Sequence, residues 1–228
     1  AGAPCIDEGQ EYGLHGRISN IPAEEVYAGT EFIEDTAVMK VKGKVREATF
    51  FGENLILNRE ITVPYGENKF IIYDTVENMG FRDEPLMILY HCNFGYPLLT
   101  SKSYFISWSE SVYPRDEEAA KGINEYSRFQ LPTPNFKEQV FYHKMKCDDE
   151  GKTFAALINP IQQVGIVIWF NKNQLWNLTQ WKMMGEGEYV LGIEPGNCHV
   201  GGRKKSREDG TLEFIKPGEI RKFKLEVE

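Results

Sequence analysis

The sequence has no apolar run that approaches the ~18 consecutive residues of a membrane-spanning helix. It has no surplus of basic residues either, since 26 Lys and Arg stand against 34 Asp and Glu and the formal net charge is −8. Nucleic acids and anionic membranes attract clustered positive charge, so we expect neither as a partner. No signal peptide is recognisable in a chain that opens with Ala, and we expect a cytoplasmic location.

Cysteine is scarce and scattered, which argues against two further classes of protein. The four cysteines, Cys5, Cys92, Cys147 and Cys198, show no CxxC spacing. We therefore expect free thiols in a reducing compartment rather than a disulfide framework. Zinc is disfavoured as well, because the neighbours His91 and Cys92 would point to opposite faces of a strand and could not readily share one ion.

Helical patterns are almost absent. Only residues 115–126 look helical, because Pro114 precedes an acidic first turn, although Gly122 weakens the middle. Turn-forming residues separate short β-like runs along the rest of the chain, at 37–45, 46–51, 54–63, 69–77, 85–93, 139–146, 153–159, 165–170, 174–183, 188–194, 211–215 and 219–227. We interpret 203–210 as a solvated hairpin loop. The pattern predicts an all-β protein, a large antiparallel β-sandwich that forms one domain over residues 1–228.

Glu194 is the most informative residue, because it is an acid at the end of a run, YVLGIEPG, that otherwise predicts a buried strand. Side chains alternate along a strand, so Gly192 lies on the same face as Glu194 and leaves space beside the carboxyl. Pro195 lacks a backbone donor and is expected to end the strand. The pattern predicts a carboxylate at a sheet end.

Two histidines lie in similar polar settings. His91 is expected to share a strand face with Asn93, just before Gly95 and Pro97 end the run, and His15 is expected to share a face with Arg17. Either histidine could be a satisfied core residue, since histidine is intermediate in its preference for burial. The flanking glycines instead favour a surface that another molecule approaches closely.

Three segments, taken in order, resemble a known family. They are GLHGR at 13–17, YHCNFGYPLL at 90–99 and GIEPGN at 192–197. Together they resemble the aldose 1-epimerase-like proteins of the galactose mutarotase superfamily, most closely its uncharacterised aldose-1-epimerase-like branch. The resemblance implies the β-supersandwich of that superfamily. It also implies an isomerase of carbohydrate metabolism with His15 orienting the sugar, His91 as general acid and Glu194 as general base.

The implied reaction suits these side chains. Interconverting the anomers of a free monosaccharide needs one proton taken from the anomeric hydroxyl and one given to the ring oxygen, and each transfer typically contributes ~10²–10⁴-fold. A carboxylate with an ordinary pKa is ionised at neutral pH, and histidine is readily poised as an acid there. The reaction requires no metal and no redox cofactor, so we expect none.

Further residues are expected to contact the sugar. Trp181 offers a ring that can stack on a sugar face, and Arg17 offers a two-pronged donor. The full set of expected substrate-binding residues is His15, Arg17, Asn93, His143, Gln180, Trp181, Lys182 and Asn197. Because Lys182 and Arg17 are positively charged, an anionic sugar is an alternative substrate to a neutral one. We interpret Trp169 and Trp176 as core residues and His199 as a loop residue.

Two departures from the family pattern affect these expectations. Family members carry several strands before the first histidine, whereas fourteen residues precede His15 here. The chain is therefore expected to be a fragment, or to have a second copy or another partner covering an exposed sheet edge. The segment 195–199 also differs from that of galactose mutarotases, so the sugar is not assigned. The main alternative is a non-catalytic carbohydrate-binding or sensor domain on the same fold, which would not need Glu194.

Overall fold

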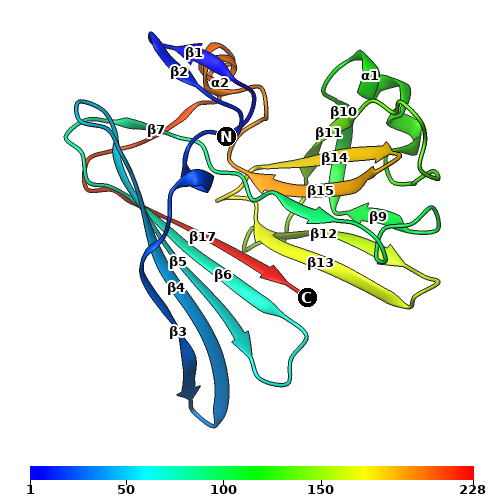
Figure 1. The fold of residues 1–228 in the computed structure, drawn as a ribbon, viewed down its shortest axis with the longest axis horizontal. Coiled ribbons are helices and arrows are strands. Elements are labelled where there is room, and N and C mark those ends of the chain that lie inside the picture. The colour runs from blue at the N-terminus through cyan, green and yellow to red at the C-terminus, as the bar shows by residue number, and fades with distance from the viewer. The chain divides into compact units, whose positions relative to one another are not determined.

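The computed structural model describes residues 1–228 and consists mainly of antiparallel strands, with two short α-helices (Figure 1). The predicted all-β, antiparallel β-sandwich class is confirmed. Contacts divide the chain into two compact units: unit 1 comprises residues 1–88 and 200–228, and unit 2 comprises residues 89–199. The single domain expected over 1–228 stays a prediction. Neither helix is long and apolar enough to span a bilayer.

Unit 1 contains a five-stranded antiparallel sheet. Its strands, in spatial order, are β3 (Glu24–Ile33), β4 (Thr36–Ala48), β5 (Asn54–Pro64), β6 (Phe70–Asn78) and β17 (Ile220–Val227). Strand β4 passes through residues 46–48 without a break, so the two runs that we expected at 37–45 and 46–51 are largely one strand, followed by a turn at 49–52. The glycine at 43 that suggested a turn lies within the pairing with β5.

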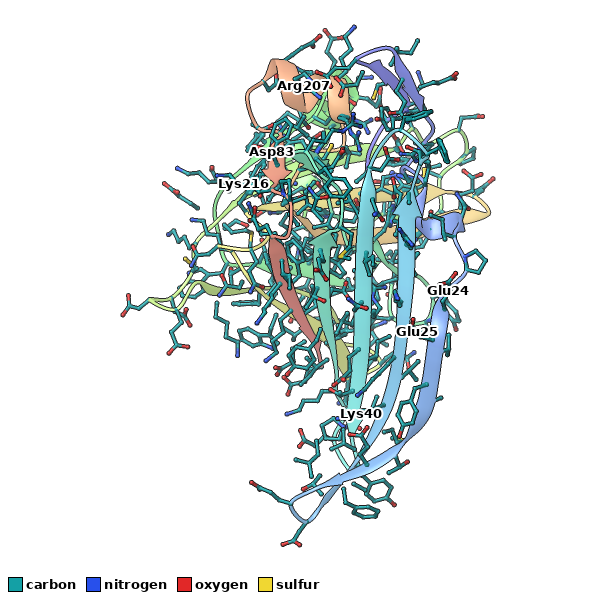
Figure 2. All side chains as sticks on the ribbon, turned by 90° about the vertical axis from the view of Figure 1, so that its left-hand side faces the viewer. Glu24, Glu25, Lys40, Asp83, Arg207 and Lys216 are labelled. Atoms are coloured by element: carbon teal, nitrogen blue, oxygen red, sulfur yellow. The ribbon has the colours of Figure 1, made fainter.

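The two faces of this sheet differ sharply in polarity. One row of paired residues carries Ala28, Val41, Ile61, Ile72 and Leu225, and the next row, on the other face, carries Tyr27, Lys42, Glu60, Tyr73 and Lys224. On the polar face the Lys42 ammonium lies 3.1 Å from the Glu60 carboxylate. Figure 2 views this sheet, with Lys40 labelled on β4 and Glu24 and Glu25 at the start of β3. The alternation follows directly from the period of two along each strand.

Unit 1 also contains a 3₁₀ turn, η1 (Ile18–Asn20), two small two-stranded antiparallel sheets and a helix. The two small sheets are β1 (Cys5–Asp7) with β2 (Gln10–Tyr12) and β7 (Glu84–Leu86) with β16 (Glu213–Ile215), and the helix is α2 (Arg203–Glu208). The solvated hairpin loop expected at 203–210 is wrong, because its first six residues form α2. The Arg207 guanidinium donates two hydrogen bonds of 2.8 Å to the Asp7 carboxylate, which anchors this basic helix to β1. Figure 2 labels Arg207 on this helix.

Unit 2 contains two antiparallel sheets. The larger has the order β10 (Ser109–Pro114), β11 (Gln139–Met145), β14 (Asn177–Gly185), β15 (Glu188–Gly196) and β8 (Cys92–Phe94). The smaller contains β9 (Tyr104–Ser107), β12 (Lys152–Asn159) and β13 (Val164–Asn171). Phe105 and Ser107 on β9 both contact His143 on β11, so the two sheets pack face to face. Their shared interior is fully buried at Phe141, Met145, Leu157, Ile168, Leu178, Leu191 and Ile193.

The helical segment of unit 2 is shorter than expected. Helix α1 (Glu117–Lys121) begins at Asp116, whose side chain accepts a hydrogen bond of 2.9 Å from the Ala119 amide, and it ends at Gly122. A 3₁₀ turn, η2 (Ile123–Glu125), follows. The N-terminal carboxylate cap and the glycine end explain both boundaries.

The strand expected at 85–93 is broken. Its ends belong to β7 in unit 1 and β8 in unit 2, and His91 lies just before β8. The shared strand face that we expected for His91 and Asn93 therefore does not come from one continuous strand. It comes instead from their pairing with β15, which is described below.

Candidate active site

The candidate site is built on one face of the larger sheet of unit 2. Strand β15 pairs with β14 so that Glu194 lies opposite Thr179 and Gly192 lies opposite Trp181. Paired residues share a face in an antiparallel sheet, so all four side-chain positions face the same way. The pairing of β14 with β11 extends this face to Tyr142, opposite Thr179. The site therefore rests on regular strand pairing rather than on loops.

His91 reaches this face through the pairing of its neighbours with β15. Ile193 pairs with Cys92, and Gly196 bridges to Leu89 in the same register. This register puts His91 opposite Glu194, and the His91 Nε2 lies 3.3 Å from the Glu194 Oε1. Asn93 lies opposite Gly192 on the same face. The structure thus brings together His91, Asn93 and Glu194, three of the residues singled out from the sequence.

The Glu194 carboxyl is held in a buried position with little compensation. The residue is 2% exposed, and its Oε1 accepts no hydrogen bond, despite the nearby imidazole. Burial, and secondly the negative charge of Glu138, raise the pKa of Glu194 from 4.5 to about 8. The ionised state that we expected for Glu194 at neutral pH is therefore disfavoured, because burial penalises the charged form.

Gly192 makes room for this carboxyl. A Cβ atom at residue 192 would overlap the Oε1 of Glu194 and would lie 3.1 Å from the Cβ of Trp181. The space that we expected beside the acid is thus filled by the acid's own side chain. Strand β15 also continues through Pro195 to Gly196, so the expected end of the strand at Pro195 is wrong. The proline carbonyl still accepts a hydrogen bond of 2.9 Å from the Tyr90 amide.

Trp181 forms one wall of the site. Its ring meets the His91 ring edge to face, with centroids 5.6 Å apart and an interplanar angle of 77°. Its indole Nε1 donates a hydrogen bond of 2.8 Å to the Glu138 Oε2, and the Glu138 Oε1 accepts one of 2.9 Å from the Arg115 Nη2. Glu138 and Arg115 were not found from the sequence, because only the pairing of β11 with its neighbours brings them to this face.

An aromatic cluster lies on the same face beyond Thr179. The His199 ring lies over Tyr142, with centroids 4.3 Å apart and an interplanar angle of 31°, and it also contacts Trp176 at 5.1 Å. Tyr113, which pairs with Tyr142, extends the cluster to the edge strand. His199 does lie in a loop, as expected. Its ring contacts were missed because the loop returns over the sheet.

Three expected sugar contacts lie on the opposite face. His143, Gln180 and Lys182 alternate with the residues of the Glu194 face and point into the interior between the two sheets. The structure therefore does not bring them together with His91 and Glu194. His143 Nε2 lies 3.1 Å from the Gln180 Oε1, its Nδ1 lies 3.0 Å from the Ser109 Oγ, and burial lowers its pKa to about 4. His143 is accordingly neutral within a polar network of the core.

Lys182 has a different environment from a surface lysine. The residue is 2% exposed, and its Nζ donates a hydrogen bond of 2.9 Å to the Glu125 carbonyl oxygen. Burial lowers the pKa of Lys182 to about 8. Lys182 thus links η2 to the inner face of β14, where it lies between Gln180 and Met184.

The two remaining expected residues of the first motif lie in unit 1. His15 is exposed and has a φ of 64°, and its amide donates a hydrogen bond of 2.8 Å to the Gly2 carbonyl. The Arg17 guanidinium lies 3.2 Å from the Glu47 carboxylate and also pairs with Glu53. Its donors are thus engaged with two carboxylates of its own unit.

Asn197 follows β15 directly and is 1% exposed. No group of three or more His, Cys, Asp or Glu side chains is arranged to hold a metal ion.

The face that carries Glu194 offers a proton donor and a proton acceptor side by side, with the Trp181 ring as an aromatic wall. Such a pair can act on two oxygen atoms that are bonded to the same carbon.

Solved structures with the same fold carry related names. A protein of Klebsiella pneumoniae described as a "putative aldose 1-epimerase" matches with a TM-score of 0.95 and 31% identity, over 99% of this chain and 59% of that protein. A galactose mutarotase-like protein of Clostridium acetobutylicum matches with a TM-score of 0.65 and 17% identity, over 99% and 74% of the two chains. The Slr1438 protein of Synechocystis matches with a TM-score of 0.67 and 16% identity, over 99% and 72%.

These likenesses establish the fold. The chain spans 59% of the length of the Klebsiella protein. A search of the curated proteins found no match. The galactose mutarotase-like fold implied by the three sequence segments is confirmed by the structural neighbours. The model of the family described as "Domain of unknown function (DUF4432)" matches residues 1–228, and the chain therefore belongs to this family.

Proposed function

We propose that the protein is an aldose 1-epimerase-like mutarotase, which interconverts the anomers of a free monosaccharide with Glu194 as general base and His91 as general acid. The observation that carries the proposal is the approach of the His91 Nε2 to 3.3 Å from the buried Glu194 Oε1, an oxygen that accepts no hydrogen bond. The likeness to proteins named after aldose 1-epimerase and galactose mutarotase supports it.

The reaction can be written so that every proton is balanced. Glu194 takes the proton of the anomeric hydroxyl while protonated His91 gives a proton to the ring oxygen. The bond from the anomeric carbon to the ring oxygen then breaks, and a carbonyl forms. After the carbonyl group rotates, His91 takes the proton back from the former ring oxygen, which attacks the other carbonyl face. Glu194 protonates the carbonyl oxygen, and both residues return to their starting state.

The anomeric hydroxyl oxygen and the ring oxygen are bonded to the same carbon. A proton donor, His91, and a proton acceptor, Glu194, that lie side by side can therefore reach both oxygens. The reactive form, an ionised carboxyl with a protonated imidazole, holds the same number of protons as a neutral carboxyl with a neutral imidazole. An anomeric hydroxyl that donates a hydrogen bond to Glu194 would favour the ionised carboxyl. The His91–Glu194 pair therefore has to hold one proton for the reaction. The raised pKa of Glu194 keeps that proton on the pair at neutral pH.

Trp181 would stack against the apolar side of the sugar ring, and Asn93 would donate to a hydroxyl from the same face. His15 stays a sugar contact expected from the resemblance, and Arg17 and Asn197 stay sugar contacts expected from their positions beside His15 and Glu194. His143, Gln180 and Lys182 are assigned to the interior of unit 2 rather than to the sugar, because their polar atoms bond there.

The test is proton NMR of anomer exchange across a panel of neutral and phosphorylated monosaccharides, with the spontaneous rate subtracted. We expect exchange to be accelerated for at least one sugar, and Glu194→Gln and His91→Gln each to reduce the rate by roughly 10²–10⁴-fold. Glu188→Gln, an exposed carboxylate on the same strand, is the matched control and should leave the rate unchanged. Sugar binding with no accelerated exchange would instead support the carbohydrate-binding alternative.

A further inference from the structure

We propose, on the basis of the proposed function, that Glu138 is a positioning residue that holds the Trp181 indole against His91 and, balanced by Arg115, sets the charge around the His91–Glu194 pair. Neither Glu138 nor Arg115 belongs to the three segments that carry the family resemblance. Both were located through their contacts in unit 2.

The first part of the proposal is about geometry. Glu138 precedes β11 on the face that carries Trp181, and its Oε2 accepts the only hydrogen bond that an indole can donate, at 2.8 Å. The indole nitrogen is far from the Trp181 Cα, so a bond at this point fixes the orientation of the whole ring. That ring meets His91 edge to face at 5.6 Å. Glu138 thus controls the wall against which the imidazole rests.

The second part is about charge. The charged or titratable side chains that face Glu194 within unit 2 are His91 beside it and Glu138 beyond Trp181, with Arg115 behind Glu138. The other neighbours on this face are Thr179 and Tyr142, with the His199 ring over Tyr142, and Lys144 lies further along, 2.9 Å from Glu110. The Asp116 carboxylate lies 2.7 Å from the Arg115 guanidinium. The charge of Glu138 helps to raise the pKa of Glu194. The Arg115 guanidinium pairs with Glu138, so we expect its positive charge to offset part of that effect. The two residues therefore act in opposite directions on the proton of the pair.

Opposite effects give a test that a purely structural role would not satisfy. Glu138→Gln keeps an oxygen acceptor for the Trp181 indole but removes a negative charge, so the pH profile of kcat/KM should move to lower pH by several tenths of a unit. Arg115→Gln removes a positive charge and should move the profile to higher pH. Arg115→Lys keeps the charge and should leave it in place. Glu110→Gln, a carboxylate paired with Lys144 on the edge strand, is the matched control for Glu138.

A measurement that does not depend on turnover separates this inference from the proposed function. The ¹³C signal of the Glu194 carboxyl, assigned by its loss in Glu194→Gln, should titrate at lower pH in Glu138→Gln and at higher pH in Arg115→Gln. The indole N–H signal of Trp181 should be kept in Glu138→Gln and shifted in Glu138→Ala, which should also lower kcat. Shifts in the same direction, or none, would overturn the inference. Full activity of Glu194→Gln would overturn the proposed function instead.

Discussion

The Glu194 carboxyl places a stability cost at the centre of the candidate site. Its pKa is 4.5 as an ordinary glutamate and about 8 in the folded protein. Between these values the unfolded chain loses the proton while the folded protein keeps it, so stability falls as pH rises through this window. The cost is on the order of 3 kcal/mol at pH 7. The same retained proton is the one that the proposed reaction requires on the His91–Glu194 pair.

We therefore expect Glu194→Gln to unfold at a higher temperature than the wild type at pH 7.5, with little difference near pH 4. The amide resembles the neutral carboxyl in size but cannot ionise, so the gain should grow between these two pH values, at roughly 2–4 °C per kcal/mol. Thermal unfolding followed by circular dichroism at several pH values measures it. Glu188→Gln should show no such growth, and a pH-independent difference for Glu194→Gln would contradict the argument.

How far the sequence predicts individual site residues depends on whether the signal is local. Glu194 could be singled out because Gly192 and the apolar alternation lie within the same strand. The contact with His91 required knowing that the segment before β8 pairs with β15, one hundred residues away in the chain, and no local pattern carries that information. His143 could not be placed because both faces of β11 are buried, so alternation identifies no exposed face.

At the scale of elements, the long strands bounded by turn-forming residues were predicted within a few residues, as β5, β6, β11, β12 and β15 show. Prediction failed where pairing rather than pattern decides the structure. Strand β3 carries three glutamates and a glycine, and β10 contains a bulge, so neither resembles an ordinary strand in sequence. Residues 85–93 look like one apolar run but are shared between two sheets, because regular pairing is interrupted at residues 87 and 88.

The pairing of β14 with β15 predicts that Gly192→Ala disables the site without breaking the sheet. The added methyl would overlap the Glu194 Oε1 and press on the Trp181 Cβ, so the carboxyl must turn away from His91. A misplacement of about 1 Å can cost about 10²-fold in rate. We expect anomer exchange to fall by about that factor while far-ultraviolet circular dichroism is unchanged.

The control for this change lies on the same pair of strands. In Gly185→Ala the nearest atom to the new methyl is the flexible end of Met183, at 3.3 Å, and no catalytic group is near it in the pairing. Gly185→Ala should therefore keep its activity. Equal activity in Gly192→Ala and Gly185→Ala would show that the position of the Glu194 carboxyl is not set by Gly192.

At the scale of the whole molecule, the sheet of unit 1 has an apolar face that is buried at one side and open at the other. Leu225 on β17 is 0% exposed, whereas Val41 and Met39 on β4 are 48% and 44% exposed and Phe32 on β3 is 79% exposed. A sheet with one apolar face normally packs that face against another layer. The edge strand β3 adds unpaired backbone groups at the same side.

The exposed apolar side chains Phe32, Met39 and Val41 predict that the chain self-associates or binds hydrophobic dyes. We expect the double variant Met39→Thr, Val41→Thr to bind less of the hydrophobic dye ANS and to sediment closer to the monomer mass, because both side chains lie on the apolar face and β4 tolerates threonine. Lys42→Thr, one residue along β4 on the polar face, should change neither measurement. Equal dye binding by the double variant and the wild type would show that this face is not the surface that drives association, since the two substitutions remove apolar groups only there.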